Sequence, residues 1–137
     1  MIYASKYDLQ PADRIVECIT QLGISKHHSV YLGTDHQGIE WIAENYKFNG
    51  VRLLKANDYF KSIISIKRIE RFKGSPTQRR NAVQRALDLV GQPYDLINFN
   101  CEHFAEYVQY GKRKSHQVEN VLAGLLTFLI IGIIISK

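Results

Sequence analysis

Residues 100–108 read Asn-Cys-Glu-His-Phe-Ala-Glu-Tyr-Val and place a cysteine at the start of an expected helix. Asn100 is a favourable N-cap residue, and apolar residues such as Phe104 and Val108 follow it at helical spacing. Cys101 would therefore lie in the first turn, where unpaired backbone N–H groups and the helix dipole favour a thiolate over a thiol. A thiolate in that position suits the nucleophile of an acyl-transfer reaction.

The segments before this helix predict one α+β domain with a mostly antiparallel sheet in its first half. Aliphatic and β-branched residues predict strands at Ile15–Thr20, Ser29–Leu32, Ile39–Ala43, Val51–Leu54 and Ile63–Ile69. A first helix is expected after Ser75, because Pro76 suits the first helical position and Gln78 completes a capping box. Gly91 is expected to end that helix.

The C-terminal stretch VLAGLLTFLIIGIIIS, residues 121–136, carries no charge and is apolar on every side. A buried core helix is not favoured, so we expect a transmembrane or membrane-inserted helix that anchors the chain. The basic run Lys112, Arg113 and Lys114 precedes it. These residues are expected to contact the membrane surface, and their charge predicts that the catalytic domain lies on the cytoplasmic side. The expected division is a catalytic domain at 1–111, a polar connector at 112–120 and an anchor at 121–136.

Composition excludes several classes of protein. The net charge is +5, and residues 61–85 hold eight basic side chains against Glu70 alone. Such a stretch either attracts anionic surfaces or is simply a solvated face. It contains few aromatic residues that could stack on nucleic-acid bases, so no nucleic-acid partner is expected. Two cysteines and no apolar signal core at the N-terminus favour a reducing compartment. No cluster of cysteines and histidines predicts a metal site.

A base for Cys101 must come from five histidines: His27, His28, His36, His103 and His116. His103 lies about 200° around the helix from Cys101, at ~100° per residue, and is expected to face away. His36 falls in a turn and His116 in the connector. His27 and His28 begin a strand, where adjacent side chains point to opposite faces, so only one is expected to face the site. Spacing alone does not choose between them.

These residues carry a resemblance to a known family. Asn100-Cys101-Glu102-His103-Phe104 and the run His27 to Gly33, which reads H-x-x-V-Y-x-G, resemble motifs of the lecithin retinol acyltransferase-like family. The small H-Rev-type phospholipase/acyltransferases are the most similar members, and Pro11-Ala12-Asp13 is similar to their P-G-D sequence. The resemblance implies a permuted papain-like (NlpC-type) fold, in which the histidine strand precedes the cysteine helix.

The resemblance also implies a reaction. Cys101 would attack an acyl ester of a glycerophospholipid, and His27 would be the general base and then the general acid. An acyl thioester would form, and water, an amine or a hydroxyl acceptor would take the acyl group. The backbone N–H of Cys101 would hold the oxyanion. No cofactor or metal is implied.

The third catalytic residue departs from the family pattern. Small members carry a second histidine on the strand after the H-x-x-V-Y-x-G motif, and this strand has none. Aligning the strand places Glu40 there, and a carboxylate can hold the imidazole tautomer and stabilise the imidazolium ion. We therefore expect Glu40 to orient His27, with His36 as the fallback.

Two other functions are consistent with the sequence. The wider superfamily cleaves amide bonds with the same residues, so a cysteine amidase or peptidase is the alternative enzyme. A membrane-remodelling module that keeps the scaffold without its chemistry is the non-enzymatic alternative. Cys101 and His27 are both present, which favours the membrane-tethered enzyme.

Overall fold

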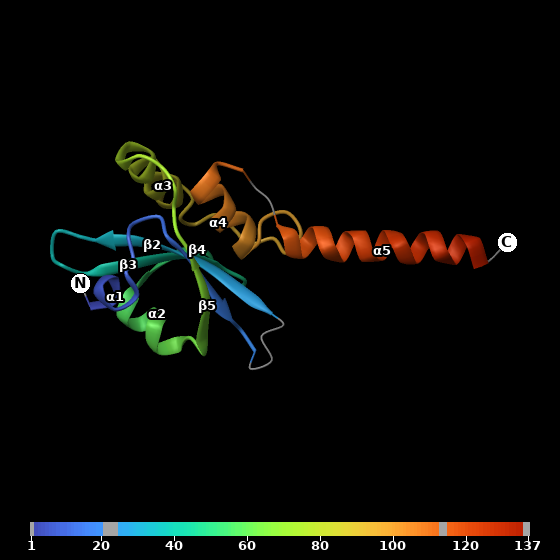
Figure 1. The fold of residues 1–137 in the computed structure, drawn as a ribbon, viewed down its shortest axis with the longest axis horizontal. Helices are drawn as coiled ribbons and strands as arrows, with labels where there is room; N and C mark the ends of the chain where they lie inside the picture. The colour runs from blue at the N-terminus through green and yellow to red at the C-terminus, as the bar shows by residue number, and fades with distance from the viewer. Residues whose placement is uncertain (1, 21–24, 113–114, 136–137) are drawn as a thin grey trace.

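The computed structural model describes residues 2–20, 25–112 and 115–135, except for the side chains of Gln117 and residues 127–135. Five antiparallel strands form one sheet in the order β4-β3-β2-β1-β5 (Figure 1). The strands are β1 (Arg14–Cys18), β2 (Lys26–Thr34), β3 (Glu40–Tyr46), β4 (Gly50–Lys55) and β5 (Ser65–Glu70). The helices are α1 (Ile2–Tyr7), α2 (Ala56–Ser62), α3 (Pro76–Asp88), α4 (Cys101–Tyr110) and α5 (His116–Ile135).

Helices cover both faces of the sheet. On one face α3 and α4 bury Val30 and Ala43 against Phe104, and on the other α1 and α2 bury Tyr31 and Ile42 (Figure 1). Alternate residues of β2 and β3 therefore belong to two different cores. Each large apolar side chain buried in this way stabilises the fold by roughly 1.5–3 kcal/mol.

The predicted α+β class and the five predicted strands are confirmed, with ends that differ by a few residues. The helix after Ser75 has the expected capping box with Gln78, and Asn100 caps α4. Helices α1 and α2 were not predicted from the sequence, because both are short and neither has a long apolar periodicity.

The loop before α4 is held to the sheet by a buried amide. Asn45 is fully buried on β3, and its Nδ2 donates a hydrogen bond to the carbonyl oxygen of Phe99 at 2.7 Å. Asn100 Oδ1 in turn accepts from the backbone N–H groups of Glu102 and His103, both at 3.0 Å. The start of α4 is thereby fixed against β3, the neighbour of the strand that carries His27 and His28.

Gly33, the last residue of the histidine motif, marks an irregularity in β2. Its φ is +96°, a left-handed conformation in which side chains are strained, and an added Cβ would lie 2.9 Å from Pro11 Cγ. The pairing between β2 and β3 shifts by one residue between Tyr31 and Gly33. A bulge of this kind changes which residues of β3 lie opposite the start of β2.

Helix α5 projects away from the sheet and the other helices (Figure 1). Among the described residues, no helix combines the length and apolarity that crossing a bilayer requires. The transmembrane helix expected at 121–136 is therefore not found in the described part of the chain. Part of that prediction, Ser136 and the side chains of 127–135, lies outside the described residues.

Candidate active site

A row of paired charges crosses one face of the sheet and ends near Cys101. His27 Nε2 lies 2.6 Å from Glu44 Oε2, and Arg52 donates to Glu44 Oε1 from Nε at 2.9 Å and from Nη2 at 2.7 Å. Strand pairing explains the row. Glu44 on β3 lies between its two cross-strand neighbours, Arg52 on β4 and Ser29 on β2. His27 is two residues from Ser29 and therefore shares its face.

The environment of His27 favours its charged form. Burial by itself would lower the pKa of His27, but its hydrogen-bonding contacts with Cys101 and Glu44 outweigh burial and raise the pKa to about 10. Burial would likewise raise the pKa of Glu44, but His27 and Arg52 outweigh burial and lower it. The arrangement holds an imidazolium ion between a carboxylate and the cysteine sulfur.

Cys101 is the first residue of α4 and is 7% exposed. Its side chain is a hydrogen-bonding neighbour of His27, so the two residues predicted from the sequence as nucleophile and base are brought together. The Asn100 side chain caps the N–H groups of Glu102 and His103 and not that of Cys101. Tyr94, from the loop before α4, lines the same space.

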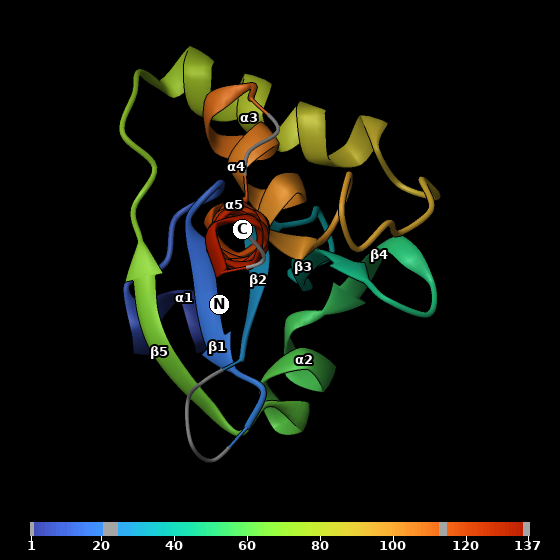
Figure 2. The ribbon, with the colours of Figure 1, turned by 90° about the vertical axis from the view of Figure 1, so that its right-hand side faces the viewer.

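The site opens into a cavity of about 730 Å³. Polar groups, among them His27, Glu44 and Cys101, occupy one part of its wall. Apolar side chains from four segments form the rest, namely Ile19, Phe48, Leu96, Ile97, Val118, Val121, Leu122 and Leu125. The last four belong to α5, which in the view along its axis lies over the region of α4, β1 and β2 (Figure 2). An apolar wall beside a thiol and an imidazole suits an acyl chain.

His28, the other candidate base, faces the opposite side of β2. Its Nδ1 accepts a hydrogen bond from Arg14 Nε at 2.9 Å, and its Nε2 lies 3.4 Å from Glu102 Oε2. Burial, followed by the charge of Arg14, lowers the pKa of His28 to about 2 and keeps the ring neutral. Both histidines are buried, because helices cover both faces of the strand.

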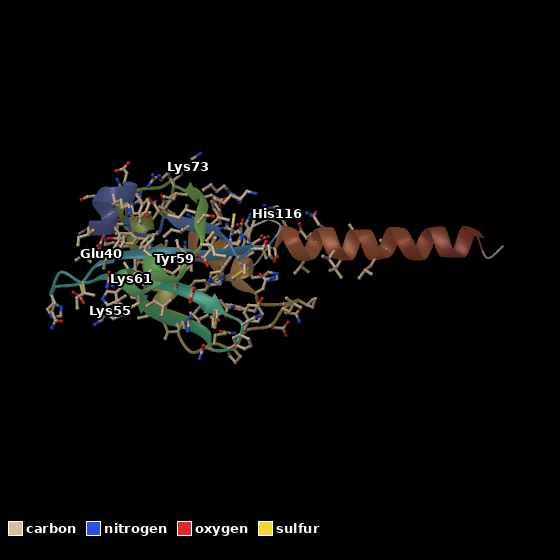
Figure 3. The ribbon with its side chains drawn as sticks, turned by 90° about the horizontal axis from the view of Figure 1, so that it is seen from below. Glu40, Lys55, Tyr59, Lys61, Lys73 and His116 are labelled. Atoms are coloured by element: carbon tan, nitrogen blue, oxygen red, sulfur yellow. The ribbon has the colours of Figure 1, made fainter. Side chains whose placement is uncertain are left out.

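Glu40 does not contact His27, so the expectation that it orients the imidazole is corrected. Its carboxylate accepts hydrogen bonds from the backbone N–H groups of Tyr3 and Ala4 and from the Tyr31 hydroxyl. Figure 3 shows Glu40 at the end of the molecule away from His116 and α5. It lies four residues, or about 14 Å at ~3.4 Å per residue, before Glu44 on the same strand. The fallback residue, His36, is exposed in the β2–β3 turn.

The remaining predicted site residues form the basic run that follows α4. Lys112 is exposed, and Arg113 and Lys114 lie outside the described residues. In the basic stretch, Arg79 binds Pro11 O and Asp13, while Arg85 donates to the carbonyl oxygens of Tyr107 and Val108 near the end of α4. Part of the local positive charge is therefore structural. In residues 2–20, 25–112 and 115–135, no group of three or more His, Cys, Asp or Glu side chains is arranged to hold a metal ion.

Sequence reasoning missed Glu44, Arg52 and a further carboxylate of the cavity, Glu17. The antiparallel hairpin of β2 and β3 contains a signal that points to Glu44 as the partner of His27. In an antiparallel pair, residues equally far from the turn lie opposite one another, so a histidine early in β2 must meet a residue late in β3.

Comparison with known proteins places the chain in a family. Residues 8–114 match the family model described as lecithin retinol acyltransferase. The chain belongs to this family. The match includes both the histidine strand and the cysteine helix.

Individual relatives match over a shorter segment. The chain is similar to phospholipase A and acyltransferase 2 of Homo sapiens, at 39% identity in an alignment of 72 residues that covers 46% of this chain and 44% of the relative. It is also similar to phospholipase A and acyltransferase 3 of Homo sapiens, at 38% identity over 47% of this chain and 46% of the relative. The protein of that name from Mus musculus is 33% identical over 46% of this chain and 44% of the relative. The matched segment thus spans less than half the length of these relatives.

Proposed function

We propose that this chain is a thiol-dependent acyltransferase and phospholipase A that acts on glycerophospholipids through an acyl thioester on Cys101. The observation that carries the proposal is the contact of His27 with both Cys101 and Glu44 at the wall of a partly apolar cavity. Membership of the lecithin retinol acyltransferase family and the similarity to proteins named phospholipase A and acyltransferase support the substrate class.

The proposed reaction begins from a Cys101 thiolate beside the His27 imidazolium ion, the pair in which His27 holds the cysteine proton. The sulfur attacks the ester carbonyl carbon, and the oxyanion accepts a hydrogen bond from the backbone N–H of Cys101. The C–O bond then breaks, and His27 gives its proton to the leaving lyso-lipid alkoxide. Water or another acceptor attacks the thioester, with neutral His27 as the base. Glu44, held by Arg52, stabilises the imidazolium ion in both steps.

The order of the elements supports the permuted papain-like fold within this proposal. The strand that carries His27 precedes the helix that begins at Cys101, and α4 contacts β2 and β3. The same order fits the cysteine amidases and peptidases of the wider superfamily. The substrate that the chain turns over must therefore distinguish a phospholipid enzyme from an amidase or peptidase.

The first test is intact mass after incubation of the whole chain with a diacyl phospholipid. We expect one acyl adduct per chain, located at Cys101 by peptide mapping and removed by hydroxylamine at neutral pH, as a thioester is. Release of lyso-lipid should accompany it. Turnover of peptides, with neither an adduct nor fatty acid from phospholipid, would assign the site to the amidase alternative.

We further propose that the apolar face of α5 holds the cavity at a lipid surface. Val121, Leu122, Leu125 and Leu126 are each at least half exposed, and the first three also line the cavity. Exposed leucines beside a site for acyl chains gain free energy when they enter the lipid interface.

Leu126→Ser tests this surface because Leu126 does not line the cavity. We expect binding to phospholipid vesicles to weaken about tenfold, since transfer of one leucine is worth roughly 1.5–3 kcal/mol. Turnover of a short-chain phospholipid below its micelle concentration should not change. Leu87→Ser on α3, where the leucine is also exposed, is the matched control. Equal vesicle binding by both variants and the wild type would refute the role of α5.

A further inference from the structure

Glu17 places a second carboxylate beside His27. It lies on β1 directly opposite His27 on β2, so the two side chains share one face of the sheet. His27 is consequently flanked by Glu44 on β3 and by Glu17 on β1. Glu17 also lines the cavity that contains Cys101. The reaction proposed above makes no use of this residue.

The Glu17 carboxyl group is incompletely satisfied. Its Oε2 is inaccessible to solvent and has no hydrogen-bond partner among the described residues. The Tyr59 hydroxyl, which accepts a hydrogen bond from Ser29 Oγ at 2.8 Å, is a neighbour that can donate its own proton to the carboxyl group. Burial raises the pKa of Glu17, although His27 and Tyr59 act in the opposite direction. An unsatisfied oxygen of this kind is costly, and nothing in the proposed acyl transfer explains it.

The cations near Glu17 are committed elsewhere. His27 lies 2.6 Å from Glu44, and Arg52 forms two hydrogen bonds with the same carboxylate. Lys26 lines the cavity, but in the described part of the chain no Lys, Arg or His nitrogen lies within 4.0 Å of a Glu17 carboxylate oxygen. A partly buried carboxylate without a cation at a mainly apolar wall is complementary to a cation that arrives with the substrate.

We propose that Glu17 binds an alkylammonium group of a substrate next to the thioester on Cys101. This inference rests on the proposed function, because it assigns a specificity-determining residue to the same cavity. The ammonium group has two possible sources. It belongs either to an amine that accepts the acyl group or to the headgroup of the lipid that donates it.

If the group belongs to the acceptor, Glu17 also fits the proton balance of aminolysis. The ammonium ion gives one proton to the Glu17 carboxylate and becomes a neutral amine. The amine nitrogen attacks the thioester carbon and passes a second proton to His27, which is neutral after the lyso-lipid has left. The C–S bond breaks with its electron pair on sulfur, an amide is released, and Glu17 returns its proton to water. The final state is the starting thiolate and imidazolium pair.

The test is the product ratio of Glu17→Gln, which keeps the shape of the side chain and removes the negative charge. With phosphatidylglycerol as donor and hexylamine as acceptor, we expect the ratio of N-hexyl amide to free fatty acid to fall about tenfold, because the variant loses the charge-assisted hydrogen bond to the ammonium group. The ratio to hexyl ester with hexanol as acceptor should not change. Asp88→Asn, an equal change of charge at an exposed position of α3, should leave both ratios as in the wild type.

A second set of reactions, without an added acceptor, identifies the source of the ammonium group. If Glu17 recognises the donor headgroup, Glu17→Gln should reduce the preference for phosphatidylcholine over phosphatidylglycerol and leave the amide ratio unchanged. A fall in the amide ratio in the first set, or in the preference for phosphatidylcholine in the second, supports an ammonium site at Glu17. No change in either set, with a normal acyl adduct on Cys101, overturns the inference and leaves the proposed function intact.

Binding provides a readout that does not depend on turnover. In a Cys101→Ala background, we expect Glu17→Gln to weaken binding of dodecylammonium about tenfold, with dodecanol bound as before. If Cys101→Ala binds dodecylammonium equally well with Glu17 and with Glu17→Gln, the inference of an ammonium site is overturned directly. Absence of any acyl adduct in the wild type, together with specific ammonium binding, would refute the proposed function alone.

Discussion

Cys101→Ala is expected to abolish the acyl adduct and to lower the release of fatty acid from phospholipid by at least about 10⁴-fold. In the proposed reaction the sulfur forms the thioester, and among the described residues that line the cavity Cys101 is the nucleophile found in contact with His27. Release of lyso-lipid and fatty acid from vesicles measures the loss. Because Cys101 is buried and small, alanine leaves the core around α4 nearly unchanged, so the loss should come without a large fall in thermal stability.

Cys18→Ala is the matched control, since it removes the other thiol of the chain. Cys18 lies at the end of β1 and does not line the cavity. We expect it to retain activity and the adduct. Loss of activity in both variants, or an adduct that persists in Cys101→Ala, would contradict the assignment of the nucleophile.

Much of the site could be predicted from local sequence. Asn100 caps α4 and Cys101 is its first residue, so the two are adjacent in sequence. The motif from His27 to Gly33 lies within one strand. Cap residues, strand alternation and the resemblance therefore led to the proposed nucleophile and base without knowledge of the tertiary structure, and the structure brings the two residues together. These assignments depend on distances of a few residues, over which backbone geometry is regular.

The carboxylate partner of His27 could not be assigned in the same way, because it depends on the register between β2 and β3. Alignment of the short strand pattern favoured Glu40, which lies opposite Thr34 at the far end of β2. Glu44 lies opposite Ser29 instead, on the His27 side of a bulge at Gly33. Both glutamates are buried, so neither composition nor periodicity distinguishes the catalytic candidate from the residue that holds α1.

Glu17 and Arg52 were missed for a related reason. Each reaches the site through strand pairing, Glu17 from β1 and Arg52 from β4. Charged residues on short strands are usually solvated, and their local sequence carries no sign of a buried partner. Only the order of the strands in the sheet brings them to His27.

Glu44→Gln is expected to lower kcat by about 10²- to 10⁴-fold, because an amide stabilises the imidazolium ion poorly and no longer fixes the imidazole tautomer. Glu40→Gln makes the same chemical change four residues away on the same strand. It should leave kcat within about twofold and instead lower the free energy of unfolding by about 1–2 kcal/mol, through weaker hydrogen bonds to Tyr3 and Ala4. A larger loss of kcat in Glu40→Gln than in Glu44→Gln would reverse the assignment.

The pH dependence separates a catalytic Glu44 from a merely structural one. In the wild type the pKa of His27 is raised from about 6.5 to about 10, so protonated His27 contributes stability that is fully present below pH 6.5 and is lost as pH rises through 10. Glu44→Gln removes one of the contacts that raise this pKa and should move the loss of imidazolium to lower pH. The difference in free energy of unfolding between the wild type and Glu44→Gln should therefore shrink between pH 6.5 and 10. The His27 ring titration, followed by NMR, should shift downward in Glu44→Gln and stay in place in Glu40→Gln. An unchanged titration in Glu44→Gln would mean that the carboxylate does not control the charge of His27, whatever its effect on rate.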